Sequence, residues 1–228
     1  MTDAVSVILC GGKGERLWPV SRRFHPKPLM KLKDRTLFTH SIERAKAISN
    51  QILVVANVDH LEKLRAETDL ESERFDFQFL AEPISRNTGP AVAMGVRHIL
   101  KNWGEETRCF VLAADHVVQD LVGFTKSMED AFNSVQKGCL TLFGVKPFCA
   151  DTGYGYIEVD DASLTSPSVK SFQEKPTFER AESFLKDGSY FWNSGMFAFK
   201  AGVFAESMQE HCPDIWEQSS ICYSNAKS

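Results

Sequence analysis

The chain has 228 residues, of which 43% are hydrophobic and 25% are charged, so it is long enough to bury a sizeable core as an ordinary globular protein. Its net charge of −4 hides an asymmetry, because residues 1–35 carry +5 and the rest carries −9. A small basic cluster on an acidic chain suits a phosphorylated small molecule better than a nucleic acid, which needs an extended basic face. We therefore expect no nucleic-acid partner.

The cysteines and the apolar segments indicate a compartment. The six cysteines form no Cys-x-x-Cys pair and no metal-ligand spacing with histidine, and several sit inside apolar runs as reduced thiols do. Residues 1–10 lack a cleavable signal pattern, and no apolar run approaches the ~20 residues that a membrane-spanning helix needs. We expect a cytoplasmic protein without a membrane partner.

Strands and helices are predicted to alternate from the N-terminus to about Val145. Residues 5–9 are nearly all apolar and stop at Gly11-Gly12, which predicts a buried strand that ends in a tight turn. Further strands are predicted at 52–56, 75–80, 109–113 and 140–145, and helices at 37–48, 61–68, 87–100 and 123–135. This alternation predicts a doubly wound α/β sheet with right-handed crossovers.

The pattern changes after Pro147. Residues 153–159 and 169–174 have the texture of antiparallel strands, and residues 190–199 form an aromatic-rich strand. We interpret these segments as a further lobe on the same sheet. Since no repeat, low-complexity tract or linker marks a boundary, we expect one domain, whose sequence stops in a polar helical segment.

The segment after the first strand is the strongest motif. It reads Gly11-Gly12-Lys13-Gly14-Glu15-Arg16-Leu17-Trp18-Pro19 and continues to Lys27. Glycines directly after a strand let backbone N–H groups approach phosphate oxygens, while Arg16 and Lys27 supply opposing charge. A dinucleotide fingerprint needs a third glycine at Leu17, and a P-loop needs Ser or Thr after Lys13. The segment therefore predicts another kind of phosphate site, with a solvated surface turn as the alternative.

Six motifs together carry a family resemblance. The segment 11–27 is similar to the signature of sugar-nucleotide pyrophosphorylases. Five later motifs occur in the order seen in mannose-1-phosphate guanylyltransferases: Glu82-Pro83-x-x-Arg86-Asn87-Thr88-Gly89-Pro90-Ala91, Ala114-Asp115-His116, Gly153-Tyr154-Gly155-Tyr156-Ile157, Phe172-Gln173-Glu174-Lys175-Pro176 and Trp192-Asn193-Ser194-Gly195-Met196-Phe197. The likeness is closest to the bacterial type in which this domain is often fused to a mannose-6-phosphate isomerase domain.

The resemblance covers nearly the whole chain and implies a fold. We expect a Rossmann-like nucleotidyltransferase fold, with a mostly parallel mixed sheet flanked by helices and an antiparallel sugar-side lobe. Family members usually carry a second metal-binding Asp further downstream, and neither Asp120 nor Asp214 matches its context. Pro28 also departs from isomerase-fused relatives, which often have Gln there, and this departure bears on the choice of nucleotide. Because the downstream Asp has no match, we expect residues 1–228 to be a nucleotidyltransferase domain that lacks its C-terminal part and carries no isomerase domain.

Asp115 is the candidate metal ligand. It follows the predicted strand 109–113, at the end of a strand where ligands of open α/β sheets bind. The resemblance implies that its metal is Mg²⁺, the expected cofactor. On the residues alone, a helix or turn cap is the alternative interpretation. We expect His116 to be structural rather than catalytic, because phosphoryl transfer needs positioning and charge neutralisation more than a proton acceptor.

The later motifs imply the sugar side of the site. Lys175 is expected to bind the sugar phosphate and Glu174 to accept hydrogen bonds from sugar hydroxyls. Asn193 offers both a donor and an acceptor, and Gly155 lets the backbone approach the ring. Without the resemblance, Glu174-Lys175 is typical of a solvated turn and Asn193 of an amide that satisfies backbone groups.

The segment 82–91 implies nucleobase recognition. The carboxylate of Glu82 is expected to pair with the guanine N1–H and amino groups. Arg86, Asn87 and Gly89 are the other candidates there, although Arg86 and Asn87 could instead tie the loop to the start of its own helix.

The implied reaction is attack by the phosphate of mannose 1-phosphate on the α-phosphorus of GTP, which gives GDP-mannose and pyrophosphate. Arg16 and Lys27 are the catalytic candidates, because they offset charge together with Mg²⁺ and Lys175. The nucleotide phosphates are assigned to Gly11, Gly12, Lys13 and Gly14. Two alternatives remain: a pyrophosphorylase for another sugar 1-phosphate or nucleotide, and a non-catalytic nucleotide-sugar binding module. A homodimer is a candidate assembly.

Overall fold

Four parallel strands form one half of the sheet. The computed structural model describes residues 3–11, 18, 21–22, 25–68, 74–82 and 87–225. In this part of the chain β1 (Ala4–Leu9) lies between β4 (Gln51–Asn57) and β6 (Arg108–Ala113), and β5 (Asp76–Glu82) pairs with β4. The order β5-β4-β1-β6 means that the chain first adds strands on one side of β1 and then crosses to the other. Such a switch opens a crevice at the carboxyl ends of β1 and β6, where ligands of open α/β sheets bind.

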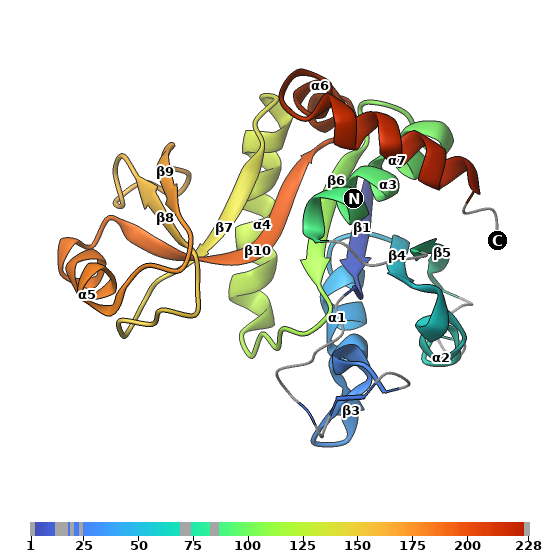
Figure 1. Cartoon of the computed structure of the whole chain (residues 1–228), viewed down its shortest axis with the longest axis horizontal. Coiled ribbons are helices and arrows are strands. Elements are labelled where there is room, and N and C mark those ends of the chain that lie inside the picture. The colour runs from blue at the N-terminus through green and yellow to red at the C-terminus, as the bar shows by residue number, and fades with distance from the viewer. Residues whose placement is uncertain are drawn as a thin grey trace.

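The other half of the sheet is antiparallel. β10 (Tyr190–Lys200) pairs with β6, then with β8 (Tyr156–Val159), and β9 (Val169–Gln173) forms the edge. β7 (Thr141–Val145) also pairs with β10, with a shift of register between Asn193 and Phe197. Figure 1 shows this lobe extending away from the parallel strands, with β10 running through both halves. The prediction of an antiparallel lobe on the same sheet is confirmed.

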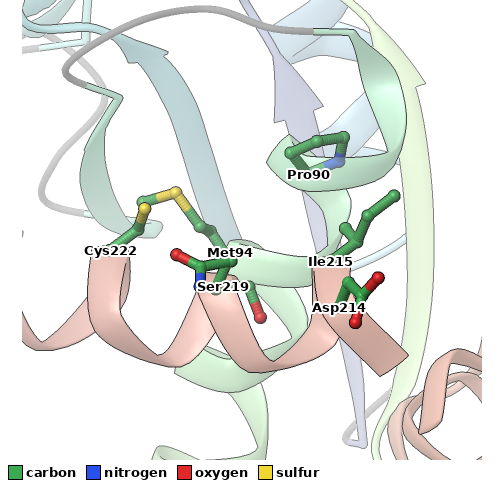
Figure 2. Close-up of a pocket in the computed structure, with 7 residues that line it drawn as sticks. Pro90, Met94, Asp214, Ile215, Ser219 and Cys222 are labelled. Atoms are coloured by element: carbon green, nitrogen blue, oxygen red, sulfur yellow. The ribbon is translucent and has the colours of Figure 1, made fainter. Parts of the chain in front are cut away.

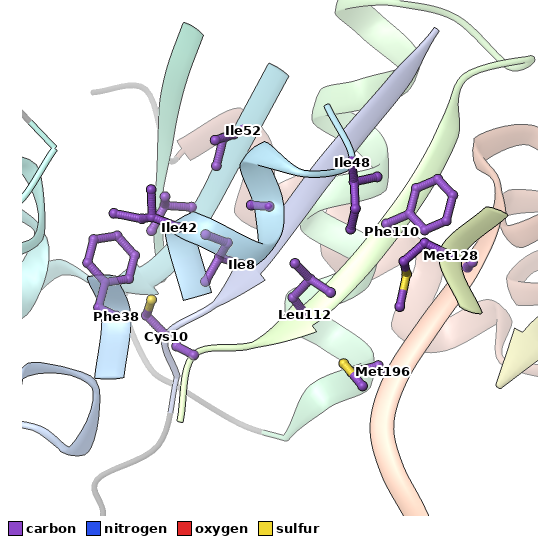
Figure 3. Close-up of a cluster of buried hydrophobic side chains, with 14 of the residues drawn as sticks. Ile8, Cys10, Phe38, Ile42, Ile48, Ile52, Phe110, Leu112, Met128 and Met196 are labelled. Atoms are coloured by element: carbon purple, nitrogen blue, oxygen red, sulfur yellow. The ribbon is translucent and has the colours of Figure 1, made fainter. Parts of the chain in front are cut away.

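Helices cover both faces of the parallel half. One face carries α1 (Leu37–Lys46) and α4 (Leu121–Gln136), and the other carries α3 (Thr88–Asn102), α6 (Ala201–His211) and α7 (Pro213–Asn225). Side chains of β1 alternate between the two cores, so that Ile8 joins the first core and Val7 the second. Figure 3 shows the first core, where Phe38 and Ile42 of α1 pack beside Ile8 and Leu112.

Shorter elements complete the described part of the chain. They are η2 (Lys27–Leu29), β2 (Lys31–Leu32), β3 (Arg35–Thr36), η3 (Val58–His60), α2 (Leu61–Ala66) and α5 (Phe178–Asp187). α5 covers the antiparallel lobe through a small core of Tyr156, Ala181, Phe184 and Trp192. No helix among the described residues combines the length and apolar character that crossing a membrane requires.

Helix starts show where local signals hold. The side chain of Thr36 accepts a hydrogen bond from the Thr39 N–H at the start of α1, and Asp120 accepts one from the Gly123 N–H at the start of α4. The predicted start of a helix at Asn87-Thr88 is confirmed, but Asn87 makes no side-chain capping bond. Its backbone has a φ of 66° and a ψ of 171°, a combination outside the left-handed helical region that is normally adopted by glycine.

We expect Phe38→Ala to lower the free energy of unfolding by about 3 to 5 kcal/mol, because Phe38 is fully buried and its removal leaves a cavity in the first core. Chemical denaturation followed by circular dichroism measures this loss. The matched control is Phe148→Ala, since the Phe148 side chain is 83% exposed. A Phe38→Ala chain as stable as the Phe148→Ala chain would contradict the core described above.

Candidate functional site

Two predicted site residues meet where β1 and β6 end. Asp115 lies two residues beyond β6, and Lys27 opens the short helix η2. The Lys27 Nζ lies 2.5 Å from Asp115 Oδ2, which joins residues 88 positions apart in the sequence. The two side chains are 35% and 33% exposed, so a ligand can reach both of them.

The ion pair sets the charge state of Asp115. Burial alone would raise the pKa of this carboxyl, yet the hydrogen bond and the charge of Lys27, together with His116, lower it below its ordinary value. Asp115 is therefore ionised at neutral pH. Burial lowers the pKa of His116, and Arg44 and Lys27 lower it further although Asp115 opposes them. The imidazole is consequently neutral at pH 7, with its Nε2 3.7 Å from Asp115 Oδ1.

A second carboxylate lies near the same crevice. Glu82 ends β5 and is buried, with 3% of the residue exposed. Burial raises the pKa of the Cys10 thiol well above its usual range, and the charges of Asp115 and Glu82 raise it further. Cys10, which follows β1, therefore remains a protonated thiol.

The sugar-side candidates gather where β8, β9 and β10 converge. Gly155 precedes β8 and its carbonyl accepts a hydrogen bond of 2.8 Å from the Asn193 N–H. A Cβ on Gly155 would lie 2.9 Å from Glu174 Oε2 and 3.0 Å from Phe172 Cζ, so any larger residue would push the Glu174 carboxylate and the Phe172 ring aside. Lys175 has a φ of 38°, and its Nζ lies 3.2 Å from Glu174 Oε1. All four predicted residues therefore lie together.

The shift of register in β10 shapes the surroundings of Asn193. Asn193 Oδ1 accepts a hydrogen bond of 3.1 Å from the N–H of Gly195, which has a φ of 69°. Ser194 Oγ donates to the Phe143 carbonyl at 2.6 Å. The amide oxygen of Asn193 therefore already serves the backbone, which is the alternative that the sequence left open.

The strand directions show how the Lys27–Asp115 pair lies relative to the sugar-side candidates. β10 runs antiparallel to β6, with Phe197 opposite Val111 and Lys200 opposite Arg108. Residues of β10 before Phe197 consequently lie toward the carboxyl end of β6, the end that Asp115 follows. Asn193 and Asp115 thus belong to the same edge of the sheet.

Several predicted residues are not brought into these two groups. Gly11 follows β1 and is exposed, while Asn87 and Gly89 are exposed at the start of α3. Five predictions lie outside the described residues: Gly12, Lys13, Gly14, Arg16 and Arg86.

Asp115 is a single metal-ligand candidate. Within the described residues, no three His, Cys, Asp or Glu side chains gather closely enough to hold an ion. Mg²⁺ at phosphate-transfer sites is commonly bound by one or two carboxylates together with substrate phosphates and water. The single ionised carboxylate of Asp115 fits such a site, in which the substrate supplies further oxygen ligands.

Sequence reasoning missed one residue that contacts this site. The side chain of Arg44, in α1, donates hydrogen bonds to the backbone carbonyls of Ala113 and His116, on either side of Asp115. One signal in the sequence could have revealed it. Arg44 shares the helical spacing of Ser41, Ala45 and Ile48, so a charged residue stands on the buried face of the predicted helix.

Two cavities in the described part of the chain lie apart from these residues. One, of about 250 Å³, separates the start of α3 from α7 (Figure 2) and is almost entirely apolar. The other, of about 470 Å³, lies between the end of α4 and the strands of the lobe. Neither is lined by a predicted site residue, so neither marks the candidate site.

Comparisons with known proteins identify the family of the chain. The family described as nucleotidyl transferase matches residues 5–227 of the chain. Alginate biosynthesis protein AlgA of Pseudomonas fluorescens is 40% identical over 222 residues, which cover 93% of this chain and 45% of that protein. Mannose-1-phosphate guanylyltransferase RfbM of Salmonella typhimurium is 36% identical over 214 residues, which cover 92% of this chain and 45% of that protein. The chain spans about half the length of these curated relatives.

A solved structure supports the fold. A protein of Thermus thermophilus, described as a mannose-1-phosphate geranyltransferase, has a TM-score of 0.85 to this chain at 30% identity. The match covers 99% of this chain and 66% of that one. The expected nucleotidyltransferase fold, with a mixed and largely parallel sheet flanked by helices, is confirmed.

The stability that Asp115 contributes should depend on pH. Since its pKa is lowered on folding, the ionised form stabilises the folded chain above the ordinary carboxyl pKa of about 4, and this contribution is lost as the pH falls through the lowered value. We expect the unfolding temperature of the wild type to be slightly above that of Asp115→Asn at pH 7, because an ion pair this exposed contributes only about 0 to 1 kcal/mol, and the gap to close below pH ~4. In a Lys27→Met background the gap at pH 7 should be smaller. A gap that does not change with pH would contradict this view of the ion pair.

The approach of Glu174 to Gly155 is testable by adding one methyl group. If the sequence-predicted sugar-phosphate site is formed here, Gly155→Ala should displace Glu174 and weaken the binding of mannose 1-phosphate roughly ten- to a hundredfold, the equivalent of losing one hydrogen bond to a charged group. Isothermal titration calorimetry measures the affinity. Gly95→Ala, in α3, is the control, because its Cβ would meet side chains of β1 and β4 at ordinary distances of 3.6 to 3.7 Å. Equal affinities for the two variants would count against a sugar-phosphate site at Gly155.

Proposed function

Because the chain belongs to the nucleotidyl transferase family, and within it to the mannose-1-phosphate guanylyltransferase type, we propose that it transfers GMP from GTP to mannose 1-phosphate. The products are GDP-mannose and pyrophosphate. The observation that carries this proposal is the meeting of Lys27 and Asp115 at the carboxyl ends of β1 and β6. A cation and a metal-binding carboxylate at this crevice are what a reaction between two polyanions requires.

The proposed chemistry is a single displacement. An oxygen of the mannose 1-phosphate attacks the α-phosphorus of GTP, a new P–O bond forms, and the bond to the bridging oxygen breaks so that pyrophosphate leaves with that electron pair. No covalent bond to the protein is needed. The chain has to align two negatively charged groups that repel each other and to offset their charge while the transferring phosphorus is shared.

The phosphate side of the site is assigned to the segment after β1. Lys27 and Arg16 offset the charge of the triphosphate, and the backbone of residues 11–14 approaches its oxygens. Mg²⁺, held by Asp115, would supply further neutralisation of phosphate charge. The Lys27 ammonium contacts Asp115 Oδ2, which leaves the second carboxylate oxygen of Asp115 for a metal ion. Lys27 and a metal ion held by Asp115 would both place positive charge near the phosphates.

The remaining candidates are assigned to the base and to the sugar. Glu82, Arg86, Asn87 and Gly89 are proposed to recognise the guanine base, from the end of β5 and the start of α3. The sugar and its phosphate are assigned to a separate set of residues in the lobe, namely Gly155, Glu174, Lys175 and Asn193. The support for this second set is their convergence at the ends of β8, β9 and β10.

A matrix of substrates tests the proposal. Pyrophosphate release is measured for GTP, UTP and dTTP, each with mannose 1-phosphate and glucose 1-phosphate. We expect the highest kcat/KM for GTP with mannose 1-phosphate. A preference for another pair would replace the proposed substrates with those of a different pyrophosphorylase. Binding of GDP-mannose without any pyrophosphate release would instead favour a non-catalytic nucleotide-sugar binding module.

Lys27→Ala should lower kcat by roughly 10²- to 10³-fold, the usual effect of removing one preorganised charge stabiliser. Arg16→Ala should behave alike. The unfolding temperature of Lys27→Ala should change little, because an ion pair this exposed contributes only about 0 to 1 kcal/mol. Lys31→Ala is the matched control, since Lys31 is an exposed lysine four residues further on in β2. A Lys27→Ala enzyme as fast as Lys31→Ala would refute the role given to Lys27.

A further inference from the structure

Arg44 is a charged side chain in the hydrophobic interior. It lies in α1, and only 1% of the residue is exposed. Burial lowers the pKa of its guanidinium to about 10, although the charge of Asp115 acts in the opposite direction. Arg44 is therefore still protonated at neutral pH. Removing a charge from water is costly, so the surroundings of Arg44 must offset that cost.

The hydrogen bonds of Arg44 converge on one short turn. Its Nη1 donates to the His116 carbonyl, and its Nη2 donates to the Ala113 carbonyl at 2.8 Å and to Ser41 Oγ at 2.9 Å. The hydroxyl of Ser41 lies 3.3 Å from the same Ala113 carbonyl. One planar group in α1 thus bonds to the backbone on both sides of Asp115.

These partners are neutral oxygens of the backbone and of a hydroxyl group. An apolar side chain of similar length would fill the same buried space in α1 without a buried charge, but it would leave the carbonyls of Ala113 and His116 without their bonds to Arg44. What an apolar side chain cannot do is bond two carbonyls three residues apart. The rigid fork of arginine suits that task, whereas lysine is a single point donor.

We propose that Arg44 is a positioning residue for Asp115: by bonding the carbonyls of Ala113 and His116 it fixes the turn that aims the Asp115 carboxylate at the metal ion and at Lys27. This inference rests on the metal role of Asp115 in the function proposed above. In this inference α1 contributes no metal ligand of its own. Through Arg44 it sets the orientation of Asp115, the carboxylate that follows β6.

The opposite end of β6 offers a matched control. Arg108 is also buried, with 7% of the residue exposed, and its Nε lies 3.4 Å from the Asp3 carbonyl. Its guanidinium stacks over the Phe132 ring at 3.7 Å. Arg108 therefore resembles Arg44 in burial and in bonding a carbonyl, but it lies at the end of β6 away from Asp115.

The test measures metal binding without turnover. Mn²⁺ is the probe, and its free concentration is followed by electron paramagnetic resonance in the wild type, Arg44→Met, Arg44→Lys and Arg108→Met, with and without GTP. We expect Arg44→Met to weaken Mn²⁺ binding by roughly 10- to 100-fold, as losses of partners behind metal ligands do, and Arg44→Lys to weaken it less. Arg108→Met should lower the unfolding temperature and leave Mn²⁺ binding unchanged. Hydrogen exchange of the amides of residues 113–116 should be faster in both Arg44 variants.

Each result decides a different point. Unchanged Mn²⁺ binding in a folded Arg44→Met chain would overturn the inference; if that chain does not fold, unchanged binding in Arg44→Lys would overturn it. A wild type that binds no Mn²⁺, or binds it equally well after Asp115→Asn, would reject the metal role of Asp115 and the inference with it. If Mn²⁺ binding depends on both Asp115 and Arg44 while the wild type releases no pyrophosphate, the proposed reaction fails and the positioning role of Arg44 stands.

Discussion

The parallel pairing of β1 with β6 is the constraint on which the candidate site depends. The two strands are in register from Ala4 opposite Arg108 to Leu9 opposite Ala113, so they end at the same level. The residues that directly follow the two strands, Cys10 after β1 and Ala114 and Asp115 after β6, are therefore brought to the same end of the sheet. Lys27 meets Asp115 at this end, across 88 residues of sequence. Burial on both faces of the sheet holds this register, because a slip of one residue would turn Ile8 and Val7 toward the wrong cores.

The charged side chains around this crevice differ in how deeply they are buried. The Lys27 and Asp115 side chains are each about one-third exposed, whereas Arg44, behind them, is fully buried. The exposed pair is open to a ligand, while the buried cation is bonded to backbone carbonyls. In the proposed reaction the first pair would meet the phosphates and Arg44 would hold the turn behind them, so burial separates the two roles.

The sequence was a good guide wherever a single local signal decides the outcome. Short apolar runs such as 5–9 and 109–113, bounded by turn residues, are typical of strands that are buried on both faces. Because Asp115 comes just after such a run, its place at the carboxyl end of the sheet was predictable. The sequence could not predict contacts that depend on how the elements pack in three dimensions. Arg44 looked like one more helical residue, because nothing local reveals that α1 faces the turn after β6. The positive φ of Asn87 was likewise not predictable from the sequence, and the alternative in which its side chain caps α3 is not seen.

β10 is shared by the two halves of the sheet, and this has a consequence for how the protein melts. Its later residues Ala198 and Phe199 belong to the large cores, while Trp192 belongs to the small core under α5. Four buried side chains are too few to keep the antiparallel lobe folded on their own. The lobe therefore draws its stability from the parallel half through a continuous strand, and the two halves should unfold in one cooperative transition rather than as separate units.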